Sequence, residues 1–340
     1  MTRTLQVAVV QDVPVPLAMA PGIKHATRLA ERAIDAGAQL VAFGETFLGG
    51  YPLWLDEAPK AALWDHPGTK QLHAILLDQA IRGNDARLKP LQKLADRTGA
   101  LISIGAHERV RNSLFNTQYL FRPLETPLKH RKLVPTHGER MLWGRGDGST
   151  LDTHQAKWGS VGQLICWEHW MPLTRAAMHH AQETVHVAAW PTVKDLYLMA
   201  SCHYAFEGRC FVLAAGTVQH SDDLLEGLDM VGGGDAARAL LKAIPRGPLQ
   251  FGGSAIVAPD GVVLARAGDA PEILQARVDL SEIGLGLAAL DVDGHYARPD
   301  VFELIVDRRP RPGVLDREEI ATHAPIEDDE SDSTGTSRAA

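Results

Sequence analysis

Three stretches of the sequence end with side chains that can carry chemistry. Glu45 follows an apolar run over residues 41–43, and Cys166 follows another over residues 161–165. Lys132 closes the basic stretch that begins at residue 129. A carboxylate can accept and return protons, a thiolate can attack an electrophilic carbon, and an ammonium can stabilise developing negative charge. These residue types are the ones that covalent catalysis by a cysteine nucleophile requires.

Each of these features also has a purely structural interpretation. A glutamate after a strand is usually solvated, a free cysteine is usually buried and inert, and a basic run is usually a solvated face. Cys166 differs from Cys202 and Cys210 because it stands between a predicted strand and a predicted helical turn. Since a helix N-terminus lowers the pKa of a thiol, we expect a reactive thiolate at Cys166.

Hydrophobic periodicity predicts the elements that position these residues. Short apolar runs rich in β-branched residues indicate strands, and apolar residues at helical spacing indicate helices. The predicted strands are Leu5–Val10, Leu40–Phe43, Leu101–Ala106, Leu114–Phe121, Pro127–Leu133, Ser160–Ile165, Val185–Ala189, Cys210–Ala214, and a hairpin of Ser254–Val257 with Val262–Arg266. The predicted helices are Pro21–Ala36, an interrupted helical region over Thr69–Arg97, Pro172–Gln182 and Asp195–Glu207.

This order of elements predicts a mixed α/β fold. No repeat and no linker divides the chain, so we expect one folded domain over residues 1–306. Residues 221–250 contain three consecutive glycines, 232–234, and are expected to form a surface excursion or mobile loop. Residues 307–340 are rich in proline and arginine and then acidic, so we expect a largely disordered extension.

Composition excludes several classes of protein. The chain has 340 residues, of which 45% are hydrophobic and 22% charged, and its formal net charge is −8. The last 25 residues hold eight acids and two bases, so −6 of that charge belongs to them. The nearly neutral remainder gives no electrostatic basis for binding nucleic acid or an anionic membrane.

Cysteine usage and the absence of apolar segments suggest the compartment. Three cysteines without a CxxC pair indicate neither a disulfide framework nor a zinc site. The N-terminal residues show no apolar core of a secretory signal, and no apolar run approaches the ~18 residues of a membrane span. We therefore expect a soluble cytoplasmic protein that contacts no membrane.

Glu45, Lys132 and Cys166 together resemble the glutamate–lysine–cysteine centre of the nitrilase superfamily, the carbon–nitrogen hydrolases. Longer strings resemble its nitrilase branch. These are GGYP at 49–52, HRKLVPT at 130–136 followed by ER and WG, CWEH at 166–169 followed by MP, and DGHYARPD at 293–300. The resemblance runs from residue 5 to about residue 302.

The resemblance implies a four-layer αββα sandwich and hydrolysis of an organic nitrile to a carboxylic acid and ammonia, with no cofactor and no metal. It implies that Cys166 forms a thioimidate and then a thioester, that Glu45 acts as general base and acid, and that Lys132 stabilises the tetrahedral intermediate. Glu139 is implied to support them. The family also pairs into dimers, which implies a homo-oligomer that can extend into spirals or filaments.

Five residues in or just after strand ends are candidates for the substrate pocket: Tyr51, Trp54, Trp167, Trp190 and Thr192. Aromatic side chains would suit aryl or arylalkyl nitriles, whereas the alternative is that they are core or interface residues. His137, His169 and His295 have no partner at metal-ligand spacing, so we expect structural hydrogen bonds from them.

Other functions remain open at this point. An amidase or a cyanide-hydrolysing enzyme would use the same three residues, and a non-catalytic binding or assembly protein could keep the fold. A Rossmann-type oxidoreductase is excluded because no GxGxxG opens a helix after a strand, and no strand precedes the glycines at 232–234.

Overall fold

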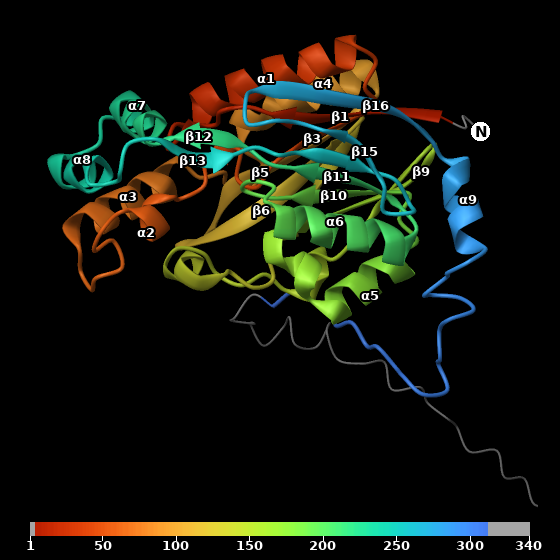
Figure 1. Cartoon of the computed structure of the whole chain (residues 1–340). Helices are drawn as coiled ribbons and strands as arrows, with labels where there is room; N and C mark the ends of the chain where they lie inside the picture. The colour runs from red at the N-terminus through yellow and green to blue at the C-terminus, as the bar shows by residue number, and fades with distance from the viewer. Residues whose placement is uncertain (1–3, 312–340) are drawn as a thin grey trace, which may run out of the picture.

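Two β-sheets are stacked face to face in the computed structural model, which describes residues 4–311, and helices cover both outer faces (Figure 1). The first sheet contains β1 (Thr4–Gln11), β2 (Val15–Pro16), β3 (Leu40–Phe43), β4 (Leu48–Gly49), β5 (Leu101–Val110), β6 (Ser113–Arg122), β7 (Glu125–Arg131) and β16 (Glu272–Asp279). The second contains β8 (His154–Ala156), β9 (Gly159–Ile165), β10 (Val185–Ala189), β11 (Phe211–Ala215), β14 (Ala255–Val257) and β15 (Val263–Arg266). A separate pair is formed by β12 (Val218–His220) and β13 (Pro248–Phe251).

The helices fall into distinct groups around the sheets (Figure 1). The helices α1 (Met19–Asp35) and α4 (Lys89–Thr98) cover the first sheet, and α5 (Pro172–His180) and α6 (Asp195–Gly208) cover the second. One end of the molecule carries α2 (Trp54–Glu57), α3 (Pro67–Gln79), α7 (Ser221–Val231) and α8 (Asp235–Lys242), and α9 (Ser281–Leu287) follows β16. Single 3₁₀ turns are η1 (Ala86–Leu88), η2 (His137–Met141), η3 (Gly148–Thr150) and η4 (Cys166–Trp170). The predicted αββα sandwich is confirmed.

Strand β1 shows why the strands read as continuous apolar runs. Leu5, Val7 and Val9 pack in the layer between the two sheets. Ala8 and Val10 point the other way, into the layer beneath α1 and α4. Because side chains alternate along a strand, a strand covered on both faces must be apolar at every position.

The central strands of each sheet run parallel and end at one edge. In the first sheet β1 pairs with β3, and β3 pairs with β5, all in parallel. In the second, β10 pairs in parallel with β9 and with β11. The backbone N–H of Glu45 donates to the carbonyl of Trp190 at 3.0 Å, which joins the loop after β3 to the residue after β10. Side chains that follow these strands are therefore brought together across the two sheets.

The alternative of a mobile loop over residues 221–250 is wrong, because this stretch forms α7, α8 and most of β13. Ala237, Leu240 and Leu241 of α8 are buried in the cluster that α3 also contributes to. Gly232 adopts φ 70° and ends α7, and Gly234 precedes the first turn of α8. The glycines thus separate two amphipathic helices, since a left-handed residue stops a helix without unravelling its neighbours.

The segment that follows α9 runs back along the molecule past α5 (Figure 1). Residues 307–311 form neither helix nor strand, and the backbone N–H of Arg311 donates to Asp147 Oδ2 at 2.7 Å. The acidic residues predicted to be disordered, from 312 onward, lie outside the described residues. No helix in residues 4–311 is both long enough and apolar enough to cross a membrane.

Candidate active site

Four chain segments bring the predicted catalytic side chains together. Glu45 lies two residues after β3, Lys132 directly after β7, and Glu139 within η2. Cys166 begins η4, immediately after β9 of the second sheet. All four residues are buried. The site therefore lies between the two sheets, with the thiol supplied by one sheet and the charged groups by the other.

The Lys132 ammonium is shared by two carboxylates. Its Nζ atom lies 2.8 Å from Glu45 Oε1, and 2.9 Å and 2.7 Å from the two carboxylate oxygens of Glu139. Burial alone would lower the pKa of Lys132, but the negative charges of Glu45 and Glu139 outweigh it and raise that pKa. Lys132 is therefore a fixed cation that can stabilise an anion formed beside it.

Glu45 has one oxygen engaged and one available. Its Oε1 atom accepts hydrogen bonds from Lys132 and from Asn116 Nδ2, the latter at 2.6 Å. Its Oε2 atom has no hydrogen-bond partner among the described residues. Burial raises the pKa of Glu45 to about 7, against the opposing effect of Lys132. A carboxyl group with such a pKa can both accept and return a proton near neutral pH.

The expected thiolate at Cys166 is wrong for the resting protein. Burial, followed by the charge of Glu45, raises the pKa of the Cys166 thiol well above its usual range, although Lys132 acts in the opposite direction. The turn η4 is a single 3₁₀ turn, and its N-terminal dipole is too small to overcome these effects. Cys166 is 4% exposed and has φ 55°. The sulfur rests as a thiol and has to lose its proton before it can react.

Glu139 is held by two further contacts. Its Oε2 atom accepts from the backbone N–H of Thr136 at 2.7 Å, and its Oε1 atom accepts from the hydroxyl of Tyr51 at 2.6 Å.

Asn116, which orients Glu45, was not predicted from the sequence. It lies within the apolar strand β6, and a polar residue in a buried strand is the one signal that could have pointed to it.

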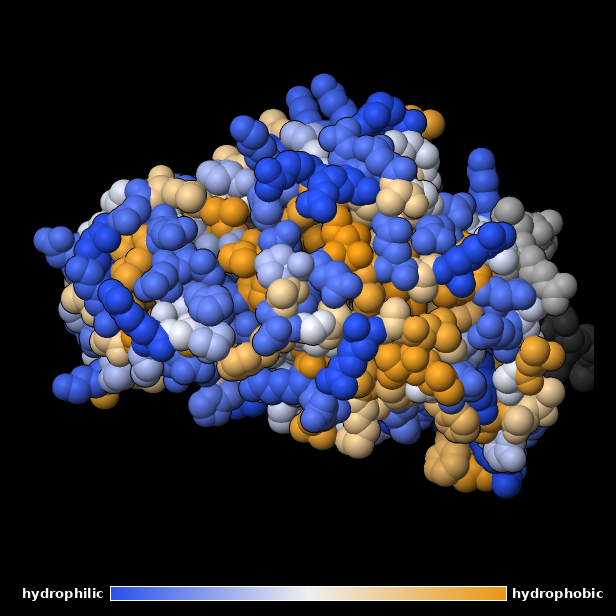
Figure 2. All heavy atoms as spheres, turned by 45° about the horizontal axis from the view of Figure 1, so that its top comes forward, coloured by the Kyte–Doolittle hydropathy of each residue, from blue (hydrophilic) through white to orange (hydrophobic). Residues whose placement is uncertain are grey.

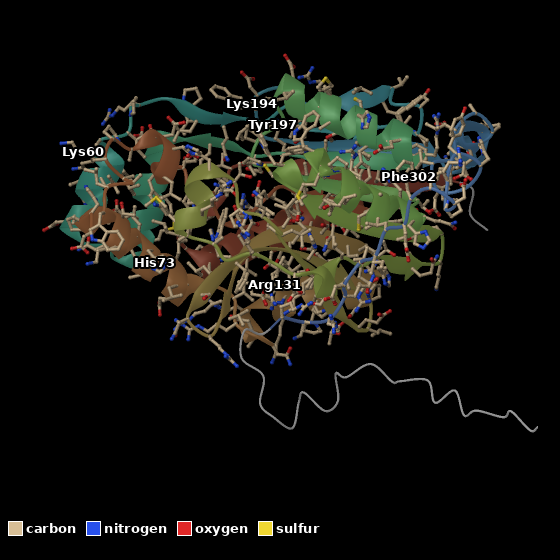
Figure 3. All side chains as sticks on the ribbon, turned by 90° about the horizontal axis from the view of Figure 1, so that it is seen from below. Lys60, His73, Arg131, Lys194, Tyr197 and Phe302 are labelled. Carbon is tan, nitrogen blue, oxygen red and sulfur yellow. The ribbon has the colours of Figure 1, made fainter. Side chains whose placement is uncertain are left out.

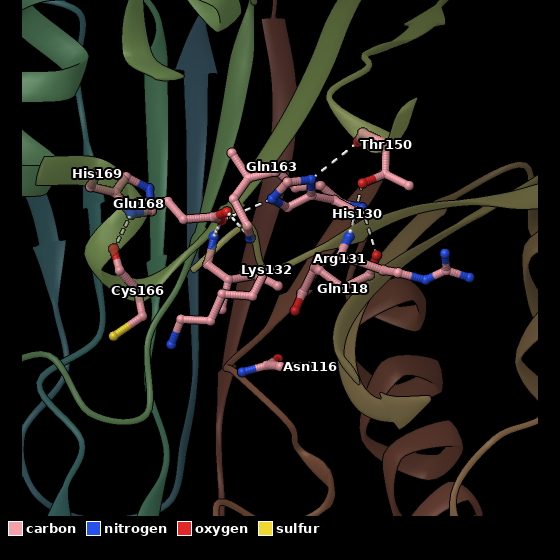
Figure 4. A network of polar contacts seen from close by, with 12 residues as sticks. Asn116, Gln118, His130, Arg131, Lys132, Thr150, Gln163, Cys166, Glu168 and His169 are labelled. Carbon is pink, nitrogen blue, oxygen red and sulfur yellow. Dashed lines mark hydrogen bonds and ion pairs between the residues drawn. The ribbon is translucent and has the colours of Figure 1, made fainter. Parts of the chain in front are cut away.

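Glu168 joins the nucleophile turn to the lysine segment (Figure 4). Its Oε1 atom accepts from the backbone N–H of Leu133 at 2.7 Å, and its Oε2 atom accepts from the N–H of Ile165 at 2.7 Å. His130 Nε2 also contacts Oε2, at 2.8 Å. Burial opposes the carboxylate charge, but His130 and these hydrogen bonds lower the pKa of Glu168 overall. One carboxylate thus fixes the residues next to both Cys166 and Lys132.

Two glycines let the Glu45 loop sit close to its surroundings. A Cβ atom at Gly44 would lie 2.8 Å from the Trp190 carbonyl oxygen. A Cβ atom at Gly105 of β5 would lie 2.2 Å from the backbone nitrogen of Thr46. Both distances are shorter than a carbon–heteroatom contact allows, so any side chain there would displace the loop that carries Glu45.

The predicted pocket residues occupy different environments. Tyr51 bonds to Glu139, and Trp167 is 44% exposed. Trp54 is packed in the cluster beneath α3 and α8, Trp190 stacks on Tyr197 and His169, and Thr192 bonds to the carbonyl of Gly252. These contacts favour packing roles for Trp54, Trp190 and Thr192, and substrate contact stays a prediction for all five.

The three histidines noted in the sequence occupy different environments. His137 is exposed at 3.8 Å from Asp56, and the ring of His295 lies 4.9 Å from that of Tyr296, tilted by 53°. His169 is buried, and its Nδ1 atom lies 2.7 Å from the Cys166 carbonyl oxygen. Within residues 4–311, no group of three or more potential ligands is arranged to hold a metal ion.

Comparison with known proteins identifies the family. Residues 6–285 match the family model for carbon–nitrogen hydrolases. The chain is 37% identical to a nitrilase of Bradyrhizobium diazoefficiens, over 92% of this chain and 95% of that protein, and 37% identical to an aliphatic nitrilase of Sinorhizobium fredii, over 91% and 98%. The crystal structure of Saccharomyces cerevisiae Nit3, a member of branch 10 of the nitrilase superfamily, covers 87% of this chain and 97% of its own, with TM-score 0.62 and 17% identity. That structure shares the fold. The chain therefore belongs to the carbon–nitrogen hydrolases of the nitrilase superfamily.

Proposed function

We propose that this protein hydrolyses an organic nitrile to a carboxylic acid and ammonia through a covalent bond to Cys166. The observation that carries the proposal is a buried ammonium shared by Glu45 and Glu139 in the same site as a buried thiol. The relatives named nitrilase and aliphatic nitrilase, at 37% identity over nearly their whole length, support the nitrile as substrate.

The first step is addition of the thiol to the nitrile carbon. Ionised Glu45 accepts the Cys166 proton, and the sulfur forms a bond to carbon while one π bond of the C≡N group breaks. The electron pair moves to nitrogen, which takes up the proton from Glu45. The product is a thioimidate on Cys166, and Glu45 is again ionised. General acid–base transfers of this kind typically contribute ~10²–10⁴-fold.

Water then completes the reaction in two additions. A water gives a proton to Glu45 as its oxygen adds to the thioimidate carbon, and Glu45 passes that proton to the nitrogen. The tetrahedral intermediate then expels ammonia, whose third hydrogen comes from the added hydroxyl group, and a thioester is left. A second water adds to the thioester and releases the acid, and the proton returns to the sulfur. The Lys132 ammonium stabilises the charge that develops in these additions, and a positioned donor of this kind is worth about 3–4 kcal/mol.

An amidase or a cyanide hydrolase is the second candidate, because the thioester half of the mechanism serves an amide equally well. A side-by-side panel of aromatic nitriles, aliphatic nitriles, amides and cyanide, with ammonia detection, separates these activities. Ammonia from nitriles, together with the matching acid, supports the proposal, and ammonia from amides or cyanide alone contradicts it.

The covalent step is tested with Cys166→Ala. We expect it to abolish ammonia release, by about 10⁴-fold or more, because no other group can form the thioimidate. Intact-mass measurement of the parent protein during turnover should show an acyl adduct that the variant lacks. Cys202→Ala, at a thiol in the middle of α6, is the matched control and should keep both activity and adduct. Turnover by Cys166→Ala at the parent rate would contradict the mechanism.

We also propose that two copies of this chain pair through the surface of α5 and α6. Large apolar side chains are exposed there: Trp167, Leu173, Leu196, Met199 and Phe206. Figure 3 places Tyr197 of α6 and Phe302 of the C-terminal segment, itself exposed, on the same side of the molecule as these helices. A cluster of exposed apolar residues of this size is typical of a protein–protein contact.

A further inference from the structure

A chain of buried polar groups leads from the nucleophile turn into the layer beneath α5 and α6. His169 Nδ1 lies 2.7 Å from the Cys166 carbonyl oxygen, and His169 Nε2 lies 3.0 Å from His186 Nε2. His186 Nδ1 lies 2.7 Å from Glu183 Oε1. The hydroxyl of Tyr204 donates to the other oxygen of Glu183. The catalytic steps proposed above use none of the last four residues.

The donors and acceptors in this chain fix where its protons lie. A carbonyl oxygen only accepts, so His169 Nδ1 carries a hydrogen. Burial lowers the pKa of His169 to about 3, so its ring is neutral and its Nε2 atom accepts. His186 Nε2 must then donate. Burial also lowers the pKa of His186, so its Nδ1 atom is an acceptor that faces Glu183.

The last link therefore needs a proton between Glu183 and His186. Both side chains are fully buried, and a neutral pair avoids two buried charges, so the proton belongs on the carboxyl. Burial raises the pKa of Glu183 to about 8, although Tyr204 and His179 act against this. Among the described residues, no lysine or arginine forms an ion pair with Glu183.

The surroundings of Glu183 are built to hold a neutral carboxyl group. His186 faces it from β10, Tyr204 from α6 and His179 from α5, and Cys210 lies nearby. On β9, a Cβ atom at Gly162 would lie 1.6 Å from Glu183 Oε1, so only glycine leaves room for the carboxyl there. The charges of His130 and Glu168 also reach His186, where His130 lowers the pKa and Glu168 raises it.

We infer that Glu183 is a positioning residue that keeps its proton at neutral pH and, through His186 and His169, holds the Cys166 carbonyl in place. Cys166 has φ 55°, a left-handed conformation that a side chain adopts only when its surroundings enforce it. A hydrogen bond to its carbonyl is one such constraint. The inference rests on the proposed function, because it concerns the placement of the proposed nucleophile.

Loss of the proton from Glu183 would reverse the whole chain. An ionised Glu183 only accepts, so His186 Nδ1 would carry the hydrogen and His186 Nε2 would accept. His169 Nε2 would then donate, and its Nδ1 atom would turn a lone pair toward the Cys166 carbonyl oxygen. The hydrogen bond that holds the nucleophile turn is lost in that state, so we expect kcat to fall above pH 8.

Glu183→Gln separates this role from a simple ion pair. A glutamine amide donates to His186 Nδ1 and accepts from Tyr204 as the protonated carboxyl does, but it cannot ionise. We expect kcat within about 2-fold of the parent at pH 7 and no fall above pH 8. Glu183→Leu removes the donor, and kcat should drop by up to ~10²-fold with KM little changed. Glu226→Gln, at an exposed position of α7, is the control and should keep the parent profile.

A spectroscopic measurement tests the chain independently of turnover. In full-length protein with ¹⁵N-labelled histidine, assigned with His169→Asn and His186→Asn, His169 should be the Nδ1–H tautomer and His186 the Nε2–H tautomer at pH 7. Both should invert above pH 8 in the parent and in Cys166→Ala, but not in Glu183→Gln. Tautomers that do not change with pH in the parent, or a Glu183→Gln variant as impaired as Glu183→Leu, would overturn the inference. Failure of the proposed function would show instead as turnover by Cys166→Ala, with these tautomers unaffected.

Discussion

Burial is the common cause of the unusual titration of Glu45 and Cys166. It raises the pKa of the carboxyl to about 7 and the pKa of the thiol well above its usual value. Since Lys132 stays cationic, the reactive form of the resting site is ionised Glu45 beside a protonated thiol. In the proposed mechanism, the reaction then begins with a proton transfer within the site, and the fraction of ionised Glu45 sets how much enzyme can react.

This argument predicts the acid limb of the pH profile. Protonated Glu45 cannot accept the thiol proton, so kcat/KM should fall about tenfold per pH unit below about pH 7 and level off between about pH 7 and pH 8, where the fall expected from Glu183 begins. Asn116→Ala removes a hydrogen bond that stabilises the carboxylate, so its limb should move to higher pH. Initial rates from pH 5 to pH 9 measure both. Asn112→Ala, at an exposed position, should leave the limb in place. An unmoved limb in Asn116→Ala would remove Glu45 as the titrating group.

At the scale of elements, Glu168 connects β7 and its following segment to β9 and η4. Its two oxygens accept from the backbone of Leu133 and of Ile165, and His130 supplies the countercharge. These partners come from both sheets, so one side chain fixes the offset between the lysine segment and the nucleophile turn. Glu168 thereby contributes both to folding stability and to the geometry of the site.

The cost of losing this carboxylate should be large. Glu168→Gln leaves the buried His130 without its countercharge, and we expect a loss of about 3–5 kcal/mol in the free energy of unfolding. Urea denaturation followed by fluorescence measures the change. The matched control is Asp300→Asn, which breaks the exposed pair with Arg298 and should cost about 0–1 kcal/mol. Equal losses of unfolding free energy in the two variants would show that the buried Glu168–His130 pair stabilises the fold no more than the exposed pair does.

At the scale of the whole molecule, α6, which covers the second sheet, exposes three large apolar side chains. Leu196, Met199 and Phe206 are each between 45% and 54% exposed. Figure 2 shows hydrophobic residues at the surface of the right-hand half of the molecule, where Figure 1 places β15 and α6. A second copy covering this surface would bury these side chains and lie next to the turn that carries Cys166.

A charge placed in this surface should prevent pairing. Met199→Glu would bury a carboxylate at the proposed contact, so we expect the particle mass from light scattering to fall toward that of one chain. Met230→Glu, at a 59% exposed position on α7, should leave the mass unchanged. A parent protein that is already a single chain at micromolar concentration, or a Met199→Glu variant of unchanged mass, would contradict the pairing proposal.

The sequence predicted the strands and the three principal site residues, because both leave local patterns. Continuous apolar runs mark strands that are buried on two faces. Glu45 and Cys166 come after such runs, and Lys132 lies at the end of a predicted strand. The glycines at 232–234 indicate a loop, but the apolar periodicity of the residues on either side is the stronger signal. That periodicity is what forms α7 and α8.

Other features of the site depend on residues that are distant in the chain. Asn116 meets Glu45 across 71 positions, and Gly162 makes room for Glu183 from a neighbouring strand. No local pattern encodes such contacts. The thiolate predicted at Cys166 failed for the same reason: a pKa is set by the dielectric and by charges that surround the group in space, and the sequence motif carries only the adjacent turn.

The thiol is carried by one sheet and its proton acceptor by the other. The apolar layer between the sheets therefore has a second role, which is to hold these two groups in register. Side chains such as Val9, Val187 and Leu213 pack there between the two sheets. Packed sheets stand ~10 Å apart, and a change of one methyl group in such a layer moves both partners. We therefore expect interior substitutions that leave the fold intact to change the reactivity of the site, because packing between the sheets holds the sulfur and the carboxylate at a fixed separation.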